Sequence, residues 1–254
     1  MPPHPVFDHP LPLAIAHRGG ALEAEENTPG AFEHAMGLGY RFVETDVQAS
    51  ADGVAVVFHD DRLERMTEGR GRVDARPWAE LSRLRTKGGV TIPRLDAVLD
   101  AYPSLHFILE AKSDAAVAPM ADAIRRTAAQ GRVCVGSFRA RRTARLRRLL
   151  GPDLAHSPAH LGIAQLWFAG WGLPLAGPRA AALQLPLAWR GIPLVRPRLV
   201  RAAHARGLQL HVWTVNDTAM MEWLIGIGVD GVITDRPSEL KRLLQRRGQW
   251  TGGP

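Results

Sequence analysis

The sequence contains a single cysteine, Cys134, so no disulfide can form within the chain. Cys134 lies in an apolar run, where we expect it to be a small buried hydrophobic residue. The chain has no apolar run long enough to cross a bilayer, and its first residues lack the charged-then-apolar pattern of a signal peptide. We therefore expect a cytoplasmic protein without stable membrane insertion.

Aromatic residues are absent from the two densest basic runs, residues 139–148 and 241–247. Arginine and lysine alternate there with leucine and alanine at helical spacing, which is typical of the solvated faces of amphipathic helices. A protein that binds single-stranded nucleic acid would need stacking aromatic side chains beside such runs. We therefore expect no nucleic-acid partner, although the net charge of +7 favours anionic substrates.

The glycine-rich phosphate fingerprint of a dinucleotide-binding fold is also missing, which argues against an open doubly wound sheet. Short apolar runs alternate instead with helical patterns, and this order predicts parallel strands joined by right-handed crossovers. Eight such units at this length predict a TIM (β/α)8 barrel. The expected strands are 13–16, 41–47, 106–111, 133–137, 154–157, 182–187, 208–214 and 231–234. The expected helices are 28–37, 95–102, 117–130, 139–150, 198–206, 218–225 and 238–247.

One domain is expected over residues 13–247, with flexible ends at 1–12 and 248–254. An insertion after the second strand, over residues 48–91, opens with a hairpin signal at Ala51-Asp52-Gly53.

Polar side chains follow the predicted strands where a TIM barrel carries its chemistry, at their C-terminal ends. Glu44 and Asp46 are two residues apart on the second strand and therefore share a face, as do Glu110 and Lys112 on the third. A divalent cation would relieve the repulsion between such carboxylates. Oxygen ligands favour Mg²⁺ or Ca²⁺ over zinc. The alternatives are strand ends exposed to water and an ion pair across the barrel mouth.

Two histidines also follow predicted strands at their C-terminal ends. The first strand runs directly into His17-Arg18 and two glycines, a pattern that suits a close approach of backbone to an anion. His59 follows the second arm of the hairpin and precedes two aspartates, so it is a candidate acid or base. The alternative is a surface loop with a helix-capping pair for His17-Arg18, and a surface turn for His59. Trp213, at the end of the seventh strand, is either core or a wall of the substrate site.

At this point the chain resembles the glycerophosphodiester phosphodiesterase family across about residues 14–244. The motifs that carry the resemblance are His17-Arg18-Gly19, Glu26-Asn27-Thr28-Pro29, Glu44-Thr45-Asp46-Val47, Asp52-Gly53, Val57-Phe58-His59-Asp60, Glu110-Ala111-Lys112, Trp213-Thr214-Val215-Asn216 and Gly231-Val232-Ile233-Thr234-Asp235.

The resemblance implies roles for these residues. Glu44, Asp46 and Glu110 would bind one divalent cation, Mg²⁺ or Ca²⁺. The acid–base pair would be His17 and His59. Arg18 and Lys112 would hold the phosphate, with Trp213 beside the substrate. The expected reaction is hydrolysis of a glycerophosphodiester, such as glycerophosphocholine or glycerophosphoethanolamine, to glycerol 3-phosphate and an alcohol.

Two other functions remain open. The same chemistry on lysophospholipids is one, because residues 161–175 are apolar, include Trp167 and Trp171, and could contact an acyl chain or a membrane surface. We expect this stretch instead to pack as an ordinary barrel helix. The other alternative, a barrel that binds without catalysis, is disfavoured because all the expected polar residues are present.

The hairpin also predicts a geometry. If residues 44–48 and 54–59 pair antiparallel around the turn, positions whose numbers sum to about 103 lie opposite one another. Val57 then lies across from Asp46, and His59 across from Glu44. His59 would stand beside the carboxylates, whereas a bulge would turn it to the opposite face.

Overall fold

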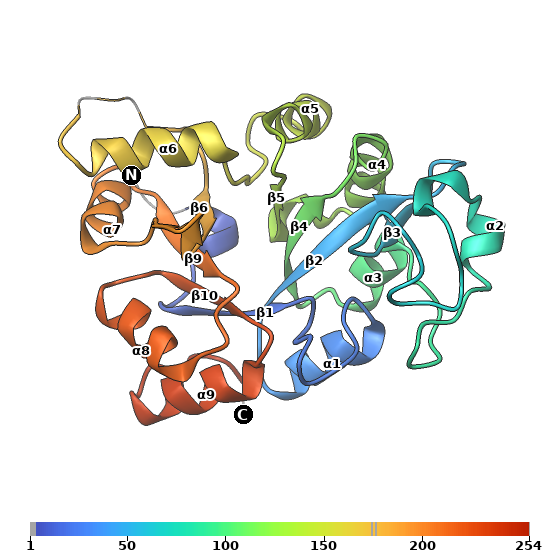
Figure 1. Cartoon of the computed structure of the whole chain (residues 1–254), viewed down its shortest axis with the longest axis horizontal. Helices are drawn as coiled ribbons and strands as arrows, with labels where there is room; N and C mark the ends of the chain where they lie inside the picture. The colour runs from blue at the N-terminus through green and yellow to red at the C-terminus, as the bar shows by residue number, and fades with distance from the viewer. Residues whose placement is uncertain (1–3, 174, 176, 254) are drawn as a thin grey trace.

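A computed structural model describes residues 4–173, 175 and 177–253 of the chain. Its parallel strands form one curled sheet in the order β5-β4-β2-β1-β10-β9-β6 (Figure 1). Their bounds are β1 Leu13–His17, β2 Phe42–Ala49, β4 His106–Ala111, β5 Val133–Gly136, β6 Ala182–Pro186, β9 Gln209–Trp213 and β10 Gly231–Thr234. This is the parallel sheet of a TIM barrel, as the strand–helix alternation predicted.

The fifth predicted strand, residues 154–157, forms no regular strand and is reduced to a bridge. His156 pairs in parallel with Val135 of β5, and its carbonyl accepts a hydrogen bond from the backbone N–H of Ala181, just before β6. The backbone N–H of Ser157 donates to the carbonyl of Val135. The segment therefore joins β5 to β6 and closes the barrel with few backbone hydrogen bonds.

The predicted helices are present, with shifts of a few residues at their ends. Thr28 shows why α1 begins there: its hydroxyl accepts from the backbone N–H of Ala31, and Pro29 occupies the first helical position. The bounds are α1 Pro29–Gly37, α2 Trp78–Leu81, α3 Leu95–Ala101, α4 Val117–Arg126, α5 Ala140–Leu150, α6 His160–Ala169, α7 Pro197–His204, α8 Thr218–Gly226 and α9 Pro237–Arg246. No helix in the described part of the chain is long and apolar enough to span a membrane.

The alternation of side chains along each strand separates the barrel interior from the layer under the helices. On β2, Val43 and Val47 pack under the helices, whereas Phe42 belongs to the cluster inside the barrel. Cys134, also in the inner cluster, is fully buried as predicted. Because successive residues face opposite ways, Glu44 and Asp46 continue the inward face of Phe42. The carboxylates therefore enter the barrel from its wall.

The two ends of the chain, for which the sequence predicts flexibility, pack on the barrel where the structure describes them, and their mobility stays a prediction. Val6 and Phe7 are buried, and the Phe7 ring packs 4.8 Å from that of His211 inside the barrel. At the other end, Trp250 packs against Tyr40. Val6 and Phe7 belong to the cluster inside the barrel, whereas Trp250 packs against the clusters under the helices.

The hairpin after β2 forms with β3, Ala55–Val57, but its predicted register is wrong by one residue. Val47, and not Asp46, lies opposite Val57. The rest of the insertion folds around a small apolar cluster of its own, and Figure 1 shows it beside β3 with α2.

The expectation that residues 161–175 pack as an ordinary barrel helix is also wrong. They include most of α6, yet Leu166 is the buried residue of this helix. Leu161 is 73% exposed and Trp171 58% exposed; Pro174 lies outside the described residues. α6 lies beside α7 (Figure 1), and Leu166 packs in the cluster that contains Leu183 and Leu185 of β6.

Candidate active site

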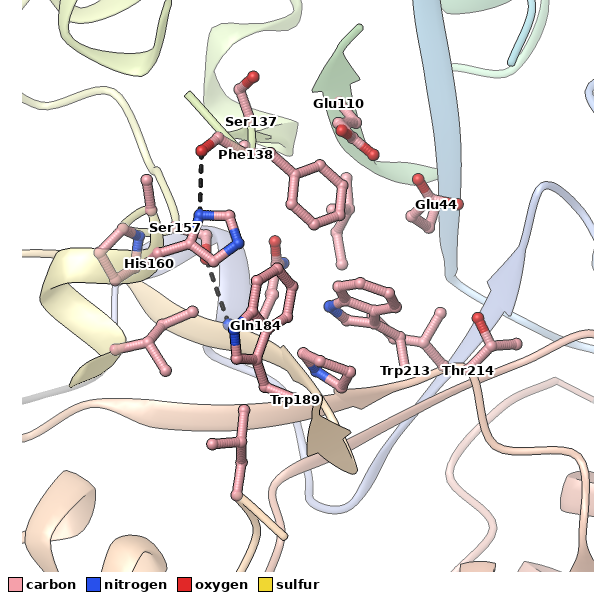
Figure 2. A pocket seen from close by; sticks show the side chains of 18 of the residues that line it. Glu44, Glu110, Ser137, Phe138, Ser157, His160, Gln184, Trp189, Trp213 and Thr214 are labelled. Carbon is pink, nitrogen blue, oxygen red and sulfur yellow. Dashed lines mark hydrogen bonds between the residues drawn. The ribbon is translucent and has the colours of Figure 1, made fainter. Parts of the chain in front are cut away.

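Three carboxylates meet at the C-terminal ends of β2 and β4. Asp46 and Glu110 are neighbours in the parallel ladder, and Glu44 lies two residues before Asp46 on the same face. One carboxylate oxygen from each residue lies within 4.8 Å of the others. Glu44 and Asp46 are buried, and Figure 2 shows Glu44 and Glu110 at one side of a pocket. This spacing suits a hard divalent cation with oxygen ligands.

The pKa values of the three carboxyl groups show that they are crowded. Burial, together with the charge of Asp46, raises the pKa of Glu44 to about 8. Burial also raises the pKa of Glu110. The pKa of Asp46 is lowered although burial opposes this, because Lys112 and Arg18 lie beside it. A bound cation would stabilise all three groups in their charged forms, so the residues present fit a divalent metal.

Two cationic side chains border the cluster. Arg18 contacts Asp46 through Nε at 3.1 Å and Glu26 through Nη1 at 3.0 Å. Lys112 Nζ lies 3.2 Å from Glu110 and 3.4 Å from Asp46. The positive charges therefore stand where an anionic substrate would approach the carboxylates.

The backbone around Arg18 is tightly folded. Arg18 itself has φ 52°, and Gly19 follows with φ 85°. A Cβ on Gly19 would lie 2.6 Å from the Cβ of Ala31 on α1, so only glycine fits at this close approach. This turn presents Arg18 to the carboxylates.

His17 is oriented by a carboxylate from the other end of the chain. Its Nδ1 lies 2.6 Å from Asp235, while its Nε2 lies 3.6 Å from Glu44. Burial alone would lower the pKa of His17, but the hydrogen bond to Asp235 and the charge of Glu44 outweigh it and raise the pKa. Asn216 donates a 2.8 Å hydrogen bond to the second oxygen of Asp235.

His59 has a similar arrangement. Its Nδ1 lies 2.5 Å from Asp60, which is held in turn by Arg65. Burial, with Lys112 nearby, lowers the pKa of His59 against the opposing charge of Asp46. In each histidine Nδ1 is bonded to an aspartate, which leaves Nε2 for the pocket.

His59 reaches the pocket although the hairpin register was predicted wrongly. The chain leaves the ladder after Val57, and Gln48 fixes the next turn by donating from Nε2 to the carbonyl of Asp60 at 3.1 Å. His59 therefore lines the same pocket as His17 and the three carboxylates.

Several polar residues around the site carried no predicted role. Asn27 donates to Asp46 at 3.0 Å and accepts from the Thr45 hydroxyl at 2.6 Å, so it links the two faces of β2. Asp60 and Asp235 bind the two histidines. Asn27, Asp60 and Asp235 all stand in the motifs quoted above, but their partners are brought to them by the fold, and spacing along the chain gives no sign of the pairing.

The pocket continues from the carboxylates into an apolar half, with a total cavity of about 490 Å³. Trp213 lines it and packs edge-on against Phe138, with ring centroids 5.7 Å apart. His160 contacts both Phe138 and Trp189. Figure 2 shows Glu44 and Glu110 on one side and His160 and Trp189 on the other. The cavity therefore pairs a charged end with an aromatic one.

The model of the glycerophosphoryl diester phosphodiesterase family matches residues 17–239. The chain belongs to that family. It is 38% identical to the probable glycerophosphodiester phosphodiesterase 2 of Mycobacterium tuberculosis (strain ATCC 25618 / H37Rv), over 94% of this chain and 93% of the relative. A putative glycerophosphoryl diester phosphodiesterase from Silicibacter pomeroyi DSS-3 superimposes with a TM-score of 0.82 at 26% identity, covering 97% of this chain and 98% of that one.

A second similar structure is that of a phosphodiesterase of Oleispira antarctica in complex with the product sn-glycerol-3-phosphate. It has a TM-score of 0.78 at 25% identity, over 92% of this chain and 97% of the neighbour. The family, the fold class and the expectation of an enzyme are thus confirmed. The segment matched by the family model contains every site residue predicted from the sequence. The individual roles of these residues stay predictions.

Proposed function

We propose that this phosphodiesterase hydrolyses glycerophosphodiesters, such as glycerophosphocholine and glycerophosphoethanolamine, to glycerol 3-phosphate and the free alcohol. The observation that carries the proposal is the meeting of three carboxylates, two cationic side chains and two aspartate-bound histidines around one cavity. The product complex of the Oleispira antarctica neighbour supports the same product. We retain the cytoplasm as the expected compartment.

Glu44, Asp46 and Glu110 would hold one divalent cation, Mg²⁺ or Ca²⁺, through carboxylate oxygens. When bound, such a cation neutralises charge on a phosphoryl oxygen and lowers the pKa of an attacking hydroxyl. Arg18 and Lys112 stand beside these carboxylates and would hold the remaining phosphate oxygens. Asn27 keeps Asp46 oriented by its 3.0 Å hydrogen bond.

The two histidines would move the protons. One takes a proton from the attacking hydroxyl, and the other delivers a proton to the leaving alkoxide. Because Nδ1 of His17 is bonded to Asp235 and Nδ1 of His59 to Asp60, the proton to be transferred is held at Nε2 in both cases. The aspartates also fix the orientation of each ring.

A panel of glycerophosphodiesters tests the proposal, with release of glycerol 3-phosphate as the readout. His17→Ala and His59→Ala should each lower kcat by roughly 100- to 10,000-fold, the usual contribution of a general acid or base. His204→Ala is the matched control, because His204 also pairs with an aspartate but lies outside the cavity lining. If His17→Ala and His59→Ala are as active as His204→Ala, the proposed acid–base role of the two histidines is wrong.

A lysophospholipid is the second candidate substrate, and the apolar half of the cavity favours it. Ile163, Trp167 and Phe168 of α6 line that half and offer contact to an acyl chain. We propose the small glycerophosphodiesters as preferred substrates. If long-chain lysophospholipids react faster by about tenfold, or 1.4 kcal/mol in transition-state binding, the lipid substrate is the correct one.

A further inference from the structure

One long segment of the chain is free of acidic residues. Between Asp153 and Asp217 the sequence contains no aspartate or glutamate, although the whole chain carries 25 of them. The charged side chains of the segment are therefore all basic. Its arginines are Arg179, Arg190, Arg196, Arg198, Arg201 and Arg206. A segment of this size with one sign of charge gives the barrel a cationic side.

The same segment exposes many of the large apolar side chains of the protein. They come from α6, the turn after it and the hairpin of β7, Ala188–Trp189, and β8, Ile192–Pro193. Those more than 40% exposed are Leu161, Phe168, Trp171, Leu173, Trp189 and Ile192. We call this set, with the elements that carry it, the apolar rim.

The apolar rim is continuous with the mouth of the cavity. Phe168, Trp189 and Ile192 line the cavity and are also exposed. Trp167 joins Phe168 to Trp171 through ring contacts at 5.2 and 5.6 Å. A partner that covers the rim would therefore face the opening of the active site.

Arginines lie directly on the exposed tryptophans. The guanidinium of Arg198 lies 3.7 Å from the ring centroid of Trp171, and that of Arg190 lies 5.9 Å from the ring of Trp189. Tryptophan and arginine side by side on an apolar surface match the boundary between lipid headgroups and acyl chains, where the ring is half immersed and the cation meets lipid phosphate.

Other partners fit the rim less well. Two copies packed through the same surface would bring arginines against arginines with no acidic group on either side, which repels. A nucleic acid would use the arginines and the tryptophans but leave the aliphatic residues Leu161, Leu173 and Ile192 without a role.

We propose that the apolar rim docks this protein on anionic lipid bilayers, with the mouth of the active site facing the membrane surface. The apolar side chains enter the headgroup–acyl boundary, and the arginines contact the lipid phosphates. This surface goes beyond the proposed function and does not depend on it. Docking requires no membrane-spanning helix.

The test is co-sedimentation of the full chain with vesicles of phosphatidylcholine alone or mixed with phosphatidylglycerol. We expect binding to the mixed vesicles, weaker binding to phosphatidylcholine, and loss of binding in about 1 M salt, where charge interactions are screened within about 3 Å. The double variant Leu161→Ser/Trp171→Ser should bind roughly a hundredfold more weakly, about tenfold for each side chain lost.

The matched control is Leu149→Ser/Trp223→Ser, which removes a leucine 41% exposed and a tryptophan 43% exposed outside the rim. Because neither Leu161 nor Trp171 lines the cavity, both double variants should hydrolyse a water-soluble glycerophosphodiester at the unaltered rate, whatever the outcome of sedimentation. Equal binding by the two double variants, or no binding by the unaltered protein, overturns docking. Docking is also overturned if the unaltered protein and the control variant are dimers while Leu161→Ser/Trp171→Ser is a monomer. Binding to oligonucleotides and not to vesicles overturns it as well.

Discussion

Asp235 orients His17, so the substitution Asp235→Asn should lower activity without unfolding the protein. Oδ1 of Asp235 lies 2.6 Å from Nδ1 of His17, and Oδ2 accepts from Nδ2 of Asn216 at 2.8 Å. An asparagine has one acceptor for these two donors. Asn216 cannot easily reverse its amide, because its own oxygen already accepts from the Thr234 hydroxyl and from the backbone N–H of residue 235.

The asparagine can turn its NH₂ group toward Asn216, which then loses its acceptor. In the other orientation the NH₂ group faces Nδ1 of His17, which must then accept a hydrogen bond, so that the proton of the neutral ring moves to Nε2. A hydrogen bond to a charged group contributes about 1.5–3 kcal/mol, which corresponds to a loss of roughly 10- to 150-fold in kcat. KM should change little, because neither oxygen of Asp235 faces the substrate. The assay is steady-state release of glycerol 3-phosphate, with thermal unfolding measured in parallel.

Asp230→Asn is the control for this prediction. Asp230 also pairs with a histidine, His204 at 2.8 Å, and accepts from the backbone N–H of Leu210. It lies outside the cavity lining, so its substitution should lower the melting temperature and leave kcat unchanged. If Asp235→Asn retains full kcat, or if its loss of activity merely follows a loss of stability as in Asp230→Asn, the orienting role is refuted.

Two further predictions concern the end of the barrel opposite the cavity. Phe7→Ala should lower the free energy of unfolding by about 3–5 kcal/mol in denaturant titration, because the ring is fully buried inside the barrel; a change below about 1 kcal/mol would mean that the N-terminal segment does not pack there. Burial lowers the pKa of His211 to about 3, so the unfolded chain takes up a proton at this residue below pH 6.5 while the folded one does not. Stability should therefore fall as the pH drops from about 6.5 toward 3, by at most about 1.4 kcal/mol per pH unit from this group, and His211→Phe should flatten that slope; an unchanged slope would contradict the prediction.

The sequence predicted the barrel and the three carboxylates for a common reason. Side chains alternate along a strand, and parallel strands bring their C-terminal ends to one rim. These rules place Glu44, Asp46 and Glu110 together without knowledge of any contact between distant residues. The contacts of the aspartates that bind the two histidines could not be predicted. Asp235, for example, is 218 residues away from His17, and only the folded barrel brings the two together.

The errors have physical causes of their own. The register of the hairpin depends on its turn, which the pattern of apolar residues does not define. The predicted partner of Val57 was Asp46, and its actual partner is Val47, one residue further along β2. His59 nevertheless reached the cavity, because the chain turns after β3. The apolar content of residues 161–175 indicated a buried helix, but Leu166 is the buried residue of α6, and it packs with Leu183 and Leu185 of β6 while Leu161 and Trp171 stay exposed.

The measurement that tests the central claim most directly is glycerol 3-phosphate release from glycerophosphocholine by protein stripped with a chelator. Mg²⁺ or Ca²⁺ is then added in steps, and Glu44→Gln, which keeps the size of the side chain but removes its charge, is titrated beside the unaltered protein. We predict no release in excess chelator, full recovery as one equivalent of cation binds, and neither binding nor recovery in Glu44→Gln. Full activity in excess chelator, or recovery by Glu44→Gln at the same cation concentration, would contradict a reaction that depends on a cation held by Glu44, Asp46 and Glu110.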